Sequence, residues 1–291
     1  MKSTPIECVQ TRAELRKIIT RWRLEGQRIG FVPTMGALHE GHLSLIKIAL
    51  KNSDKVVASI FVNPTQFAPG EDLDDYPRMP EEDSKKLRDA GCHLAYSPTV
   101  EEMYPEGSLT NIRVETLSDL LDGGPRPHFF YGVATIVARL FVHVRPDVAV
   151  FGQKDYQQLQ IIKRMTRDLG FEIEILGGET VRHADGLAQS SRNLYLQPDE
   201  RRGASGLFAC LQRARARIEA GTPTEIALAE AVTYLSACGF SKIDYVTATH
   251  PETLEALPEG PAAKATEGRL LGAAWFGKTR LIDNIGFRRP E

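Results

Sequence analysis

Cysteine is scarce in this sequence, and the cysteines that occur form no pattern. The four of them stand far apart in a chain of 291 residues, and no two make a Cys-x-x-Cys pair. This usage is typical of reduced, packed thiols in a cytosolic protein, and it argues against a disulfide framework or a zinc knuckle. The cysteines are Cys8, Cys92, Cys210 and Cys238.

Long apolar runs and an excess of one charge are also missing. No stretch approaches the roughly 20 apolar residues that a membrane span needs. The charged residues between Lys2 and Lys17 argue against a signal peptide. The formal net charge of −2 disfavours a surface made for nucleic acid or for an anionic membrane. We therefore expect a cytoplasmic protein that binds neither, and whose function depends on local sites.

Short apolar strands alternate with helical stretches over much of the chain, which predicts a parallel sheet with right-handed crossovers in a Rossmann-like α/β fold. Ligands of such sheets bind beyond the carboxyl ends of the strands. The loops 33–42, 63–67 and 152–155 each follow a strand, so we expect them to meet at one edge. The predicted strands are Ile29–Val32, Val56–Val62, Cys92–Tyr96, Val148–Phe151 and Phe171–Leu176, and the predicted helices are Glu81–Ala90, Val133–Val144, Tyr156–Leu169 and one beginning at His42.

The pattern changes after about Val181. Two helical stretches are followed by strands that are predicted to be antiparallel. We expect a Rossmann-like binding domain over residues 1–180 and a smaller α+β lid domain over residues 181–291. The predicted helical stretches are Pro198–Ala220 and Thr224–Ala237, and the predicted strands are Lys242–Thr247 and Arg269–Phe276, with strand-like sequence continuing at Leu281–Ile285.

One segment matches a phosphate-binding pattern out of context. Gly272–Thr279 fits G-x-x-x-x-G-K-[ST], which requires a flexible loop that opens a long helix. Here Trp275 and Phe276 occupy the loop positions, and the sequence that follows is strand-like. No helix N-terminus is available to hold a phosphate. We therefore reject this match.

The segment His39-Glu40-Gly41-His42 carries the strongest local signal. Two histidines three residues apart at a helix start lie on one face, beside unpaired backbone N–H groups. These groups and the helix dipole favour phosphate, and Gly36 and Gly41 permit close approach of a ligand. Two surface histidines or a metal site are the alternatives, although the zinc pattern H-E-x-x-H places its histidines four apart. The motif alone favours phosphate binding and leaves the other two open.

Two further polar segments suit a nucleotide. In Gly152–Asp155, Lys154 can neutralise a phosphate and Asp155 can accept from a ribose hydroxyl, but an ordinary helix start explains that segment better when it is taken alone. Ser190–Asn193 offers hydroxyls and a guanidinium that suit an oxyanion, and a polar turn explains it equally well. Three such segments on one chain are harder to dismiss together.

With three more segments, these motifs resemble the pantothenate synthetase (pantoate–β-alanine ligase) family. That family belongs to the nucleotidylyltransferases related to class I aminoacyl-tRNA synthetases. The segments occur in the family's order and extend over nearly the whole chain. They are PTMGALHEGH (33–42), FVNPTQF (61–67), DLDDYPR (72–78), GQKDYQQL (152–159), SSRN (190–193) and RLIDN (280–284).

The resemblance implies an activity and its partners. The expected reaction is the ATP-dependent condensation of (R)-pantoate with β-alanine to pantothenate, a precursor of coenzyme A. It would pass through pantoyl-adenylate and release AMP and pyrophosphate. The resemblance also implies Mg²⁺ on the ATP phosphates, and a homodimer.

The resemblance also implies roles for individual residues. Catalytic roles are expected for His39, His42, Lys154 and Arg192. ATP contacts are expected for Met35, Gly36, His39, Gly41, His42, Gly152, Gln153, Lys154, Asp155, Val181, Gln189, Ser190, Ser191 and Arg192. Pantoate or β-alanine contacts are expected for Pro33, Met35, Asn63, Gln66 and Gln158. The candidate Mg²⁺ ligand is Asp83, with Glu82 beside it.

The chain departs from the family pattern at two places. Phe129 stands where the family has a histidine, with His128 one position earlier, and Gln189 stands where Met or Leu is common. Two rival functions also remain. Another nucleotidylyltransferase would need a basic acceptor pocket, and a nucleotide sensor without turnover would not need His39, His42, Lys154 and Arg192 together.

Overall fold

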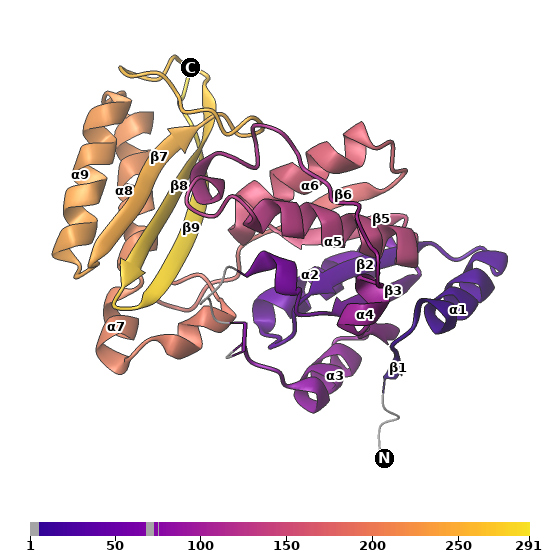
Figure 1. The fold of residues 1–291 in the computed structure, drawn as a ribbon. Coiled ribbons are helices and arrows are strands. Elements are labelled where there is room, and N and C mark those ends of the chain that lie inside the picture. The colour runs from indigo at the N-terminus through magenta and orange to yellow at the C-terminus, as the bar shows by residue number, and fades with distance from the viewer. Residues whose placement is uncertain (1–5, 68–72, 75) are drawn as a thin grey trace. The chain divides into compact units, whose positions relative to one another are not determined.

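The computed structural model describes residues 6–67, 73–74 and 76–291. Asp72 and Asp75 of the segment 72–78 lie outside the described residues. The chain divides into two compact units (Figure 1). The first unit is Met1–Gln153 with Gln158–Glu179, and the second unit is Lys154–Gln157 with Thr180–Glu291.

The first unit is built on a six-stranded parallel sheet in the order β1-β4-β3-β2-β5-β6 (Figure 1). This sheet, flanked by helices, confirms the predicted Rossmann-like α/β class. Its strands are β1 (Glu7–Val9), β2 (Ile29–Thr34), β3 (Lys55–Ile60), β4 (Leu94–Tyr96), β5 (Val148–Gly152) and β6 (Glu174–Gly178). Its helices are α1 (Arg12–Leu24), α2 (Glu40–Asn52), α3 (Pro80–Asp89), α4 (Val100–Met103), α5 (Phe129–Val144) and most of α6 (Tyr156–Asp168).

Side chains of β2 show how the sheet is covered. Phe31 packs edge-on against Phe141 of α5, with ring centroids 6.4 Å apart. Val32, the next residue, belongs to a buried cluster with Leu45 and Ile46 of α2. Successive side chains of a strand point to opposite faces of the sheet. The helices α5 and α2 therefore cover opposite faces of β2.

The strand order positions the loops that carry the motifs. β3 and β5 both pair with β2 in parallel, so the carboxyl ends of these three strands share one edge of the sheet. The segment 35–39 follows β2, the short 3-10 helix η1 (Pro64–Gln66) follows β3, and Gly152 ends β5. The chain leaves β2 for β3 on one side and returns to β5 on the other, which is the point where open α/β sheets bind ligands.

The second unit is an antiparallel sheet with helices. Its strands follow the order β7-β8-β9, and α8 contacts both β8 and β9. Leu207 and Leu211 of α8 pack with Leu235 of α9 and Leu270 of β8 in one buried cluster. The elements are α7 (Pro198–Gly203), α8 (Gly206–Glu219), α9 (Thr224–Ala237), β7 (Lys242–Thr249), β8 (Glu267–Phe276) and β9 (Thr279–Arg288).

Some details differ from the sequence-based prediction. The single helical stretch predicted at Pro198–Ala220 is two helices, α7 and α8, which are separated by Ala204 and Ser205. Glycines beside this break pack closely, because a Cβ on Gly203 would lie 2.6 Å from the ring of Phe276. The strand β1 was not predicted, since a strand of three residues is too short to produce a periodic signal.

The rejected phosphate-loop match lies in a β-hairpin. Gly272–Phe276 is the end of β8, and Thr279 begins β9. Phe276 pairs with Thr279 across a two-residue turn, in which Gly277 has φ of 57°. This left-handed conformation suits glycine in a hairpin turn. The structure thus confirms that Gly272–Thr279 does not open a helix.

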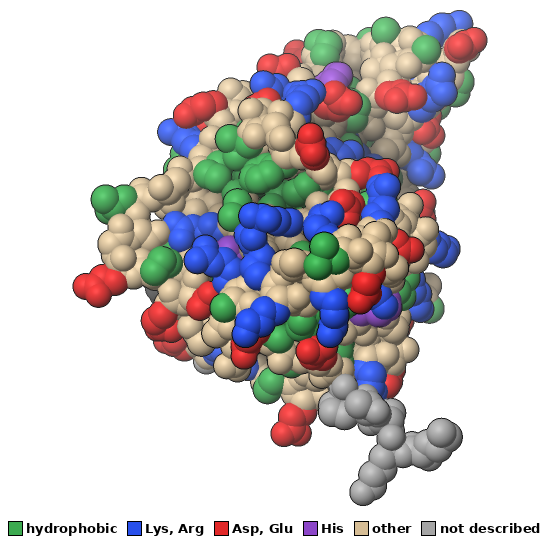
Figure 2. Space-filling view, turned by 90° about the vertical axis from the view of Figure 1, so that its right-hand side faces the viewer, with side chains coloured by type: hydrophobic (Ala, Val, Ile, Leu, Met, Phe, Trp, Pro, Cys, Tyr) green, Lys and Arg blue, Asp and Glu red, His purple; other side chains and the backbone are tan. Residues whose placement is uncertain are grey.

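The described surface carries both signs of charge. The face drawn in Figure 2 carries both basic and acidic side chains, and the formal net charge of the chain is −2. In the part of the chain that the structure describes, no helix combines the length and the apolar character that crossing a membrane requires.

Candidate functional site

Asp83 holds the loop that follows β2. Its two carboxylate oxygens accept hydrogen bonds from the backbone N–H groups of Ala37 (2.9 Å) and Leu38 (2.8 Å), and the residue is 1 % exposed. Lys86, one turn further along α3, donates to the carbonyl of Leu38 at 2.6 Å. Gly36 has φ of 87° and Ala37 has φ of 49°, both in the left-handed region. Such a backbone is costly for alanine unless its surroundings fix it, and Asp83 provides that fixation.

The two histidines close the start of α2. His39 is the N-cap residue, and its Nδ1 accepts from the N–H of Gly41 at 3.1 Å. Nδ1 of His42 accepts from the N–H of His39 at 3.3 Å. The two ring centroids lie 4.1 Å apart. Because Nδ1 is an acceptor in each ring, the Nε2 atom of each carries the proton when the ring is neutral.

Gly41 is needed for this arrangement. A Cβ at that position would lie 2.8 Å from Cε1 and 2.9 Å from Nδ1 of His39. Distances under 3.0 Å are closer than real Cβ contacts. Any side chain at position 41 would therefore displace the ring of His39.

The helix dipole and two Nε2–H donors thus occur together at the start of α2, where the N–H groups of His39 and Gly41 are already bonded to the ring nitrogens. A helix N-terminus of this kind is suited to bind an anion, phosphate above all. The sequence-predicted residues Met35, Gly36, His39, Gly41 and His42 all belong to this one segment.

The turn after β3 carries two predicted substrate residues, Asn63 and Gln66, whose side chains differ in their contacts. Asn63 is 1 % exposed, and its side chain helps to hold the turn. Its Nδ2 donates to the carbonyl of Gly132 at 3.2 Å, and its Oδ1 accepts from the hydroxyls of Thr65 (3.0 Å) and Tyr104 (2.8 Å). Burial raises the pKa of Tyr104, so its hydroxyl stays protonated and donates. This geometry supports a role for Asn63 in shaping the loop.

Gln66, on the same turn, is 8 % exposed. Gln158 lies in the first turn of α6 and is partly buried. Among the described residues, neither side-chain amide makes a hydrogen bond. Both amides are therefore available to hydroxyl groups of a ligand, and each follows a strand that pairs with β2. Pro33 and Met35, at the end of β2 and just after it, are also partly buried.

The other predicted residues belong to the second unit, apart from Gly152 and Gln153 at the end of β5. Lys154 has a side chain that is 18 % exposed, and its ammonium lies 3.5 Å from the carboxylate of Asp155. Residues 181–189 form a small hairpin in which the N–H of Gln189 donates to the carbonyl of Val181 at 2.9 Å. This hairpin leads directly into Ser190.

The segment after the hairpin is a 3-10 helix, η4 (Ser191–Tyr195). Ser190 is its N-cap residue, and the side chain accepts from the N–H of Arg192 at 3.3 Å. Asn193 ties the segment back, because its Nδ2 donates to the carbonyl of Ala188 at 3.0 Å. Ser190, Ser191 and Arg192 thus lie together in one capped turn, which was predicted as an oxyanion clamp.

Comparison with known proteins decides the family. The family described as pantoate-beta-alanine ligase matches residues 7–286. The chain belongs to this family. As a member of the pantoate-beta-alanine ligase family, it is an enzyme and a ligase, and the family resemblance inferred from its motifs is confirmed.

The similarity to relatives and to solved structures extends along nearly the whole chain. The chain is 62 % identical over 289 residues to a pantothenate synthetase of Hyphomonas neptunium, covering 99 % of each sequence. A pantothenate synthetase structure from Thermus thermophilus is 47 % identical with a TM-score of 0.90, covering 96 % of this chain and 99 % of that one. The pantoate-beta-alanine ligase from Francisella tularensis, solved with beta-gamma ATP and beta-alanine, is 31 % identical with a TM-score of 0.81, covering 96 % and 97 %.

A protein ligand for Mg²⁺ is not apparent at the expected position. Asp83 is buried, and both its oxygens already accept backbone hydrogen bonds. Glu82 instead pairs with Lys86 at 2.7 Å. Within residues 6–67, 73–74 and 76–291, no three His, Cys, Asp or Glu side chains are grouped to hold a metal ion. Asp83 therefore does not fit the role of a metal ligand.

The departure from the pantoate-beta-alanine ligase pattern at 128–129 has a visible consequence. Phe129 lies under the guanidinium of Arg126, which is 4.1 Å from the ring centroid. His128 is the N-cap residue of α5 without a side-chain cap bond, and its buried Nε2 has no hydrogen-bond partner among the described residues. The histidine of this region thus begins a helix of the first unit.

Sequence reasoning missed the roles of Asp83 and Tyr104. A weak signal existed for Asp83, because it stands four residues before Leu87 and so shares the buried face of α3. An acidic residue on the apolar face of a helix indicates a buried partner. Nothing in the sequence connects Tyr104 with Asn63.

Proposed function

We propose that this chain condenses pantoate with β-alanine, driven by ATP, through a pantoyl-adenylate, and releases AMP and pyrophosphate. Family membership supports the substrates, as does the complex of the Francisella tularensis relative with beta-gamma ATP and beta-alanine. The observation that carries the proposal is the start of α2, where Asp83 and Gly41 fix a loop that presents two imidazoles at a helix N-terminus.

The first step requires charge stabilisation at phosphorus. A carboxylate is a poor electrophile, so its oxygen attacks the α-phosphate of ATP and pyrophosphate leaves. Fixed donors at the places where charge develops lower the barrier to such a step. In our proposal His39 and His42 donate to the phosphates through Nε2, and the nucleotide also contacts Met35, Gly36 and Gly41 of the same segment.

Residues of the second unit complete the nucleotide contacts in this proposal. Lys154 bridges a phosphate and the acyl oxygen, because an ammonium is a compact, strong donor for both. Ser190, Ser191 and Arg192 hold the departing pyrophosphate. Weaker contacts are proposed to the ribose and the base, from Gly152, Gln153, Asp155, Val181 and Gln189.

The second step is attack of the β-alanine amine on the acyl carbon. The C–O bond to AMP breaks, and the amide of pantothenate forms. Gln66 and Gln158 are proposed to bind the hydroxyls of pantoate, because both amides are available. Pro33 and Met35 are proposed to contact its methyl groups, with Asn63 shaping the loop that carries Gln66. These interactions contribute chiefly by positioning the reactants.

Mg²⁺ enters the proposal only with ATP. The cation prefers hard oxygen ligands and keeps several waters, so it is proposed to reach the enzyme on the phosphates. When bound there, it would neutralise part of their charge. No step is assigned to a protein-held metal, since Asp83 is already occupied by the backbone of Ala37 and Leu38.

The remaining parts of the proposal concern the whole chain. We take residues 1–180 as the nucleotide- and pantoate-binding domain and residues 181–291 as a lid. A homodimer in the cytoplasm is the expected form, because the family resemblance implies one. Sedimentation velocity at micromolar concentration distinguishes a dimer from a monomer.

The function is tested by measuring pyrophosphate release from MgATP. With pantoate alone we expect release that stops after about one turnover, and sustained release only when β-alanine is also present. Release that does not depend on pantoate would contradict the substrate assignment. Nucleotide binding without any pantoate-dependent pyrophosphate would favour a nucleotide sensor.

A further inference from the structure

The segment 280–284 is one of those on which the family resemblance rests, but no step of the proposed reaction uses its residues. In β9 it places two polar side chains next to each other inside the second unit, Asp283 at 4 % and Asn284 at 3 % exposure. Burying polar groups costs free energy unless each is hydrogen-bonded. A buried pair in a strand that otherwise contributes Leu281 and Ile285 to the core therefore requires an explanation.

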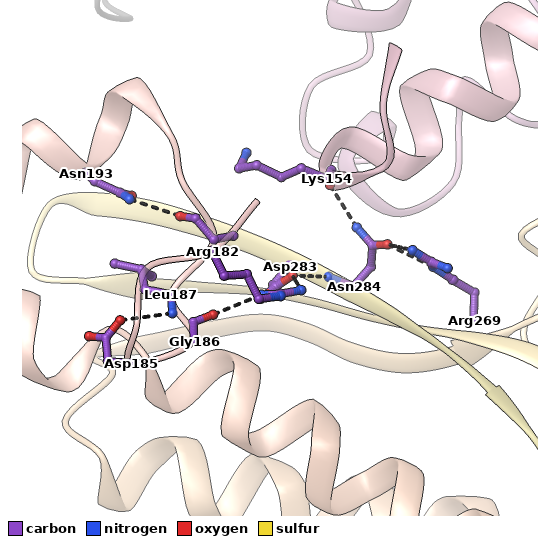
Figure 3. A network of polar contacts seen from close by, with 10 residues as sticks. Lys154, Arg182, Asp185, Gly186, Leu187, Asn193, Arg269, Asp283 and Asn284 are labelled. Atoms are coloured by element: carbon purple, nitrogen blue, oxygen red, sulfur yellow. Dashed lines mark hydrogen bonds and ion pairs between the residues drawn. The ribbon is translucent and has the colours of Figure 1, made fainter. Parts of the chain in front are cut away.

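Asn284 is bonded on every side. Its Nδ2 donates to the main-chain carbonyl of Lys154 at 2.8 Å, and its Oδ1 accepts from Nε of Arg269 at 2.8 Å and also from Nη2. Its own N–H donates to Oδ1 of Asp283 at 2.7 Å. An arginine side chain has donors only, so Arg269 fixes the amide oxygen toward itself. The amide nitrogen must then face Lys154, as Figure 3 shows.

Arg269 contacts the segment 154–156 directly as well as through Asn284. Its guanidinium lies 4.1 Å from the ring centroid of Tyr156, two residues after Lys154. Burial lowers the pKa of Arg269, and the oxygen of Asn284 offers a neutral acceptor for it. Asn284 and Arg269 thus attach residues 154–156 to the three-stranded sheet, and all of these residues belong to the second unit.

Asp283 joins β9 to the hairpin that precedes Ser190 through a side-chain contact. It accepts two hydrogen bonds from Arg182, at 2.6 and 2.9 Å, and Arg182 also donates to the carbonyl of Gly186 at 3.0 Å. The same guanidinium lies over the ring of Phe208, 3.7 Å from its centroid. Asp283 also accepts from the N–H of Asn284. The ion pair with Arg182 therefore helps to hold the backbone of Asn284 in place.

The contact with Lys154 is made to its main chain. In Figure 3 the Lys154 side chain extends away from Asn284, whose amide points at the Lys154 carbonyl. Asn284 thus fixes the main chain from which the Lys154 side chain extends. The ammonium lies away from Asn284 and can bind other partners (Figure 3). A shift of about 1 Å in a positioned group can cost about 100-fold in rate.

We propose that Asn284 is a positioning residue for Lys154. This inference rests on the proposed function, in which the ammonium of Lys154 contacts phosphate and acyl oxygen. The neutral amide is required, because one end must accept from Arg269 while the other donates to a carbonyl. Aspartate at this position keeps the acceptor for Arg269 and turns the donor into an oxygen that repels the carbonyl of Lys154.

The test compares Asn284→Asp with Asn111→Asp, which adds the same charge at an exposed position. We expect Asn284→Asp to lower kcat for pantoate-dependent pyrophosphate release about 10- to 100-fold, with Asn111→Asp within about twofold of wild type, as is usual for surface substitutions. In a Lys154→Ala background, Asn284→Asp should lower the residual rate by less than about threefold, because residues that act as a unit are not additive.

Other outcomes overturn the inference. An unchanged kcat in Asn284→Asp would do so. A loss of rate that is equally large in the wild-type and Lys154→Ala backgrounds would also do so, because it indicates a general effect on folding. If the aspartate variant does not fold, Asn284→Ala removes the amide donor without adding charge and is expected to give the same two results. Wild-type enzyme that releases no pantoate-dependent pyrophosphate would instead contradict the proposed function, which distinguishes the two failures.

Discussion

At the scale of single residues, the loop after β2 depends on side chains with no direct part in the reaction. Asp83 accepts the N–H groups of Ala37 and Leu38, and these two bonds hold a backbone that alanine rarely adopts. Charged acceptors give hydrogen bonds roughly twice as strong as neutral ones. The fixed donors at the start of α2 are therefore formed before any ligand arrives, as electrostatic preorganisation requires.

Gly41 gives a sharp test at this scale. In Gly41→Ala the new Cβ meets the ring of His39 at under 3.0 Å, so the ring must move. We expect kcat/KM for ATP to fall about 10-fold or more. Thermal stability should change little, since the preference of alanine over glycine in a helix, up to about 1 kcal/mol, offsets the loss of the His39 cap. Activity assays and calorimetry on the same preparation check both, and a large loss of stability would contradict this explanation.

At the scale of elements, α5 and β4 share a buried polar contact. The hydroxyl of Tyr96 and Nδ1 of His143 lie 2.9 Å apart. Burial lowers the pKa of His143 to about 4, and burial raises that of Tyr96. Both groups therefore stay neutral at pH 7, and helix and strand are joined without a buried charge.

This contact predicts how stability depends on pH. The unfolded chain binds a proton at His143 near pH 6.5, whereas the folded chain does so only near pH 4. Between these values the unfolded state holds more protons, so this group lowers the stability as the pH falls from about 6.5 to about 4. The thermal midpoint should decline over that window, and His143→Gln should reduce the slope. An equal slope in the variant would refute the assignment.

Long, periodic elements were predictable because their burial repeats along the chain. The helix α9 was predicted with its bounds, Thr224–Ala237, and β2 and α2 were found from their apolar residues. Short elements such as β1 lack that repetition. Beside the break between α7 and α8, Gly203 packs closely against Phe276, which is distant in sequence.

The candidate site was predictable only in part, for a similar reason. The resemblance identified the segments that carry His39, Lys154 and Ser190, but not what holds them. Asp83 is 45 residues from Leu38 and Asn284 is 130 residues from Lys154. Partners this far apart leave no spacing pattern, and a buried acidic residue looks in sequence like a metal ligand.

At the scale of the whole molecule, the proposed reaction uses groups from both units of the chain. The start of α2 belongs to the first unit, and Lys154 and Ser190–Arg192 belong to the second. The central claim is that a carboxylate oxygen of pantoate attacks the α-phosphate of ATP. That oxygen must stay on AMP when the amine displaces it, so its fate reports the intermediate.

The most direct measurement is therefore the transfer of ¹⁸O from pantoate labelled in its carboxylate, with MgATP and β-alanine, followed by mass spectrometry of AMP and pyrophosphate. We expect one ¹⁸O atom in each AMP formed and none in pyrophosphate. Label in pyrophosphate or inorganic phosphate, or AMP without label, would contradict the adenylate pathway.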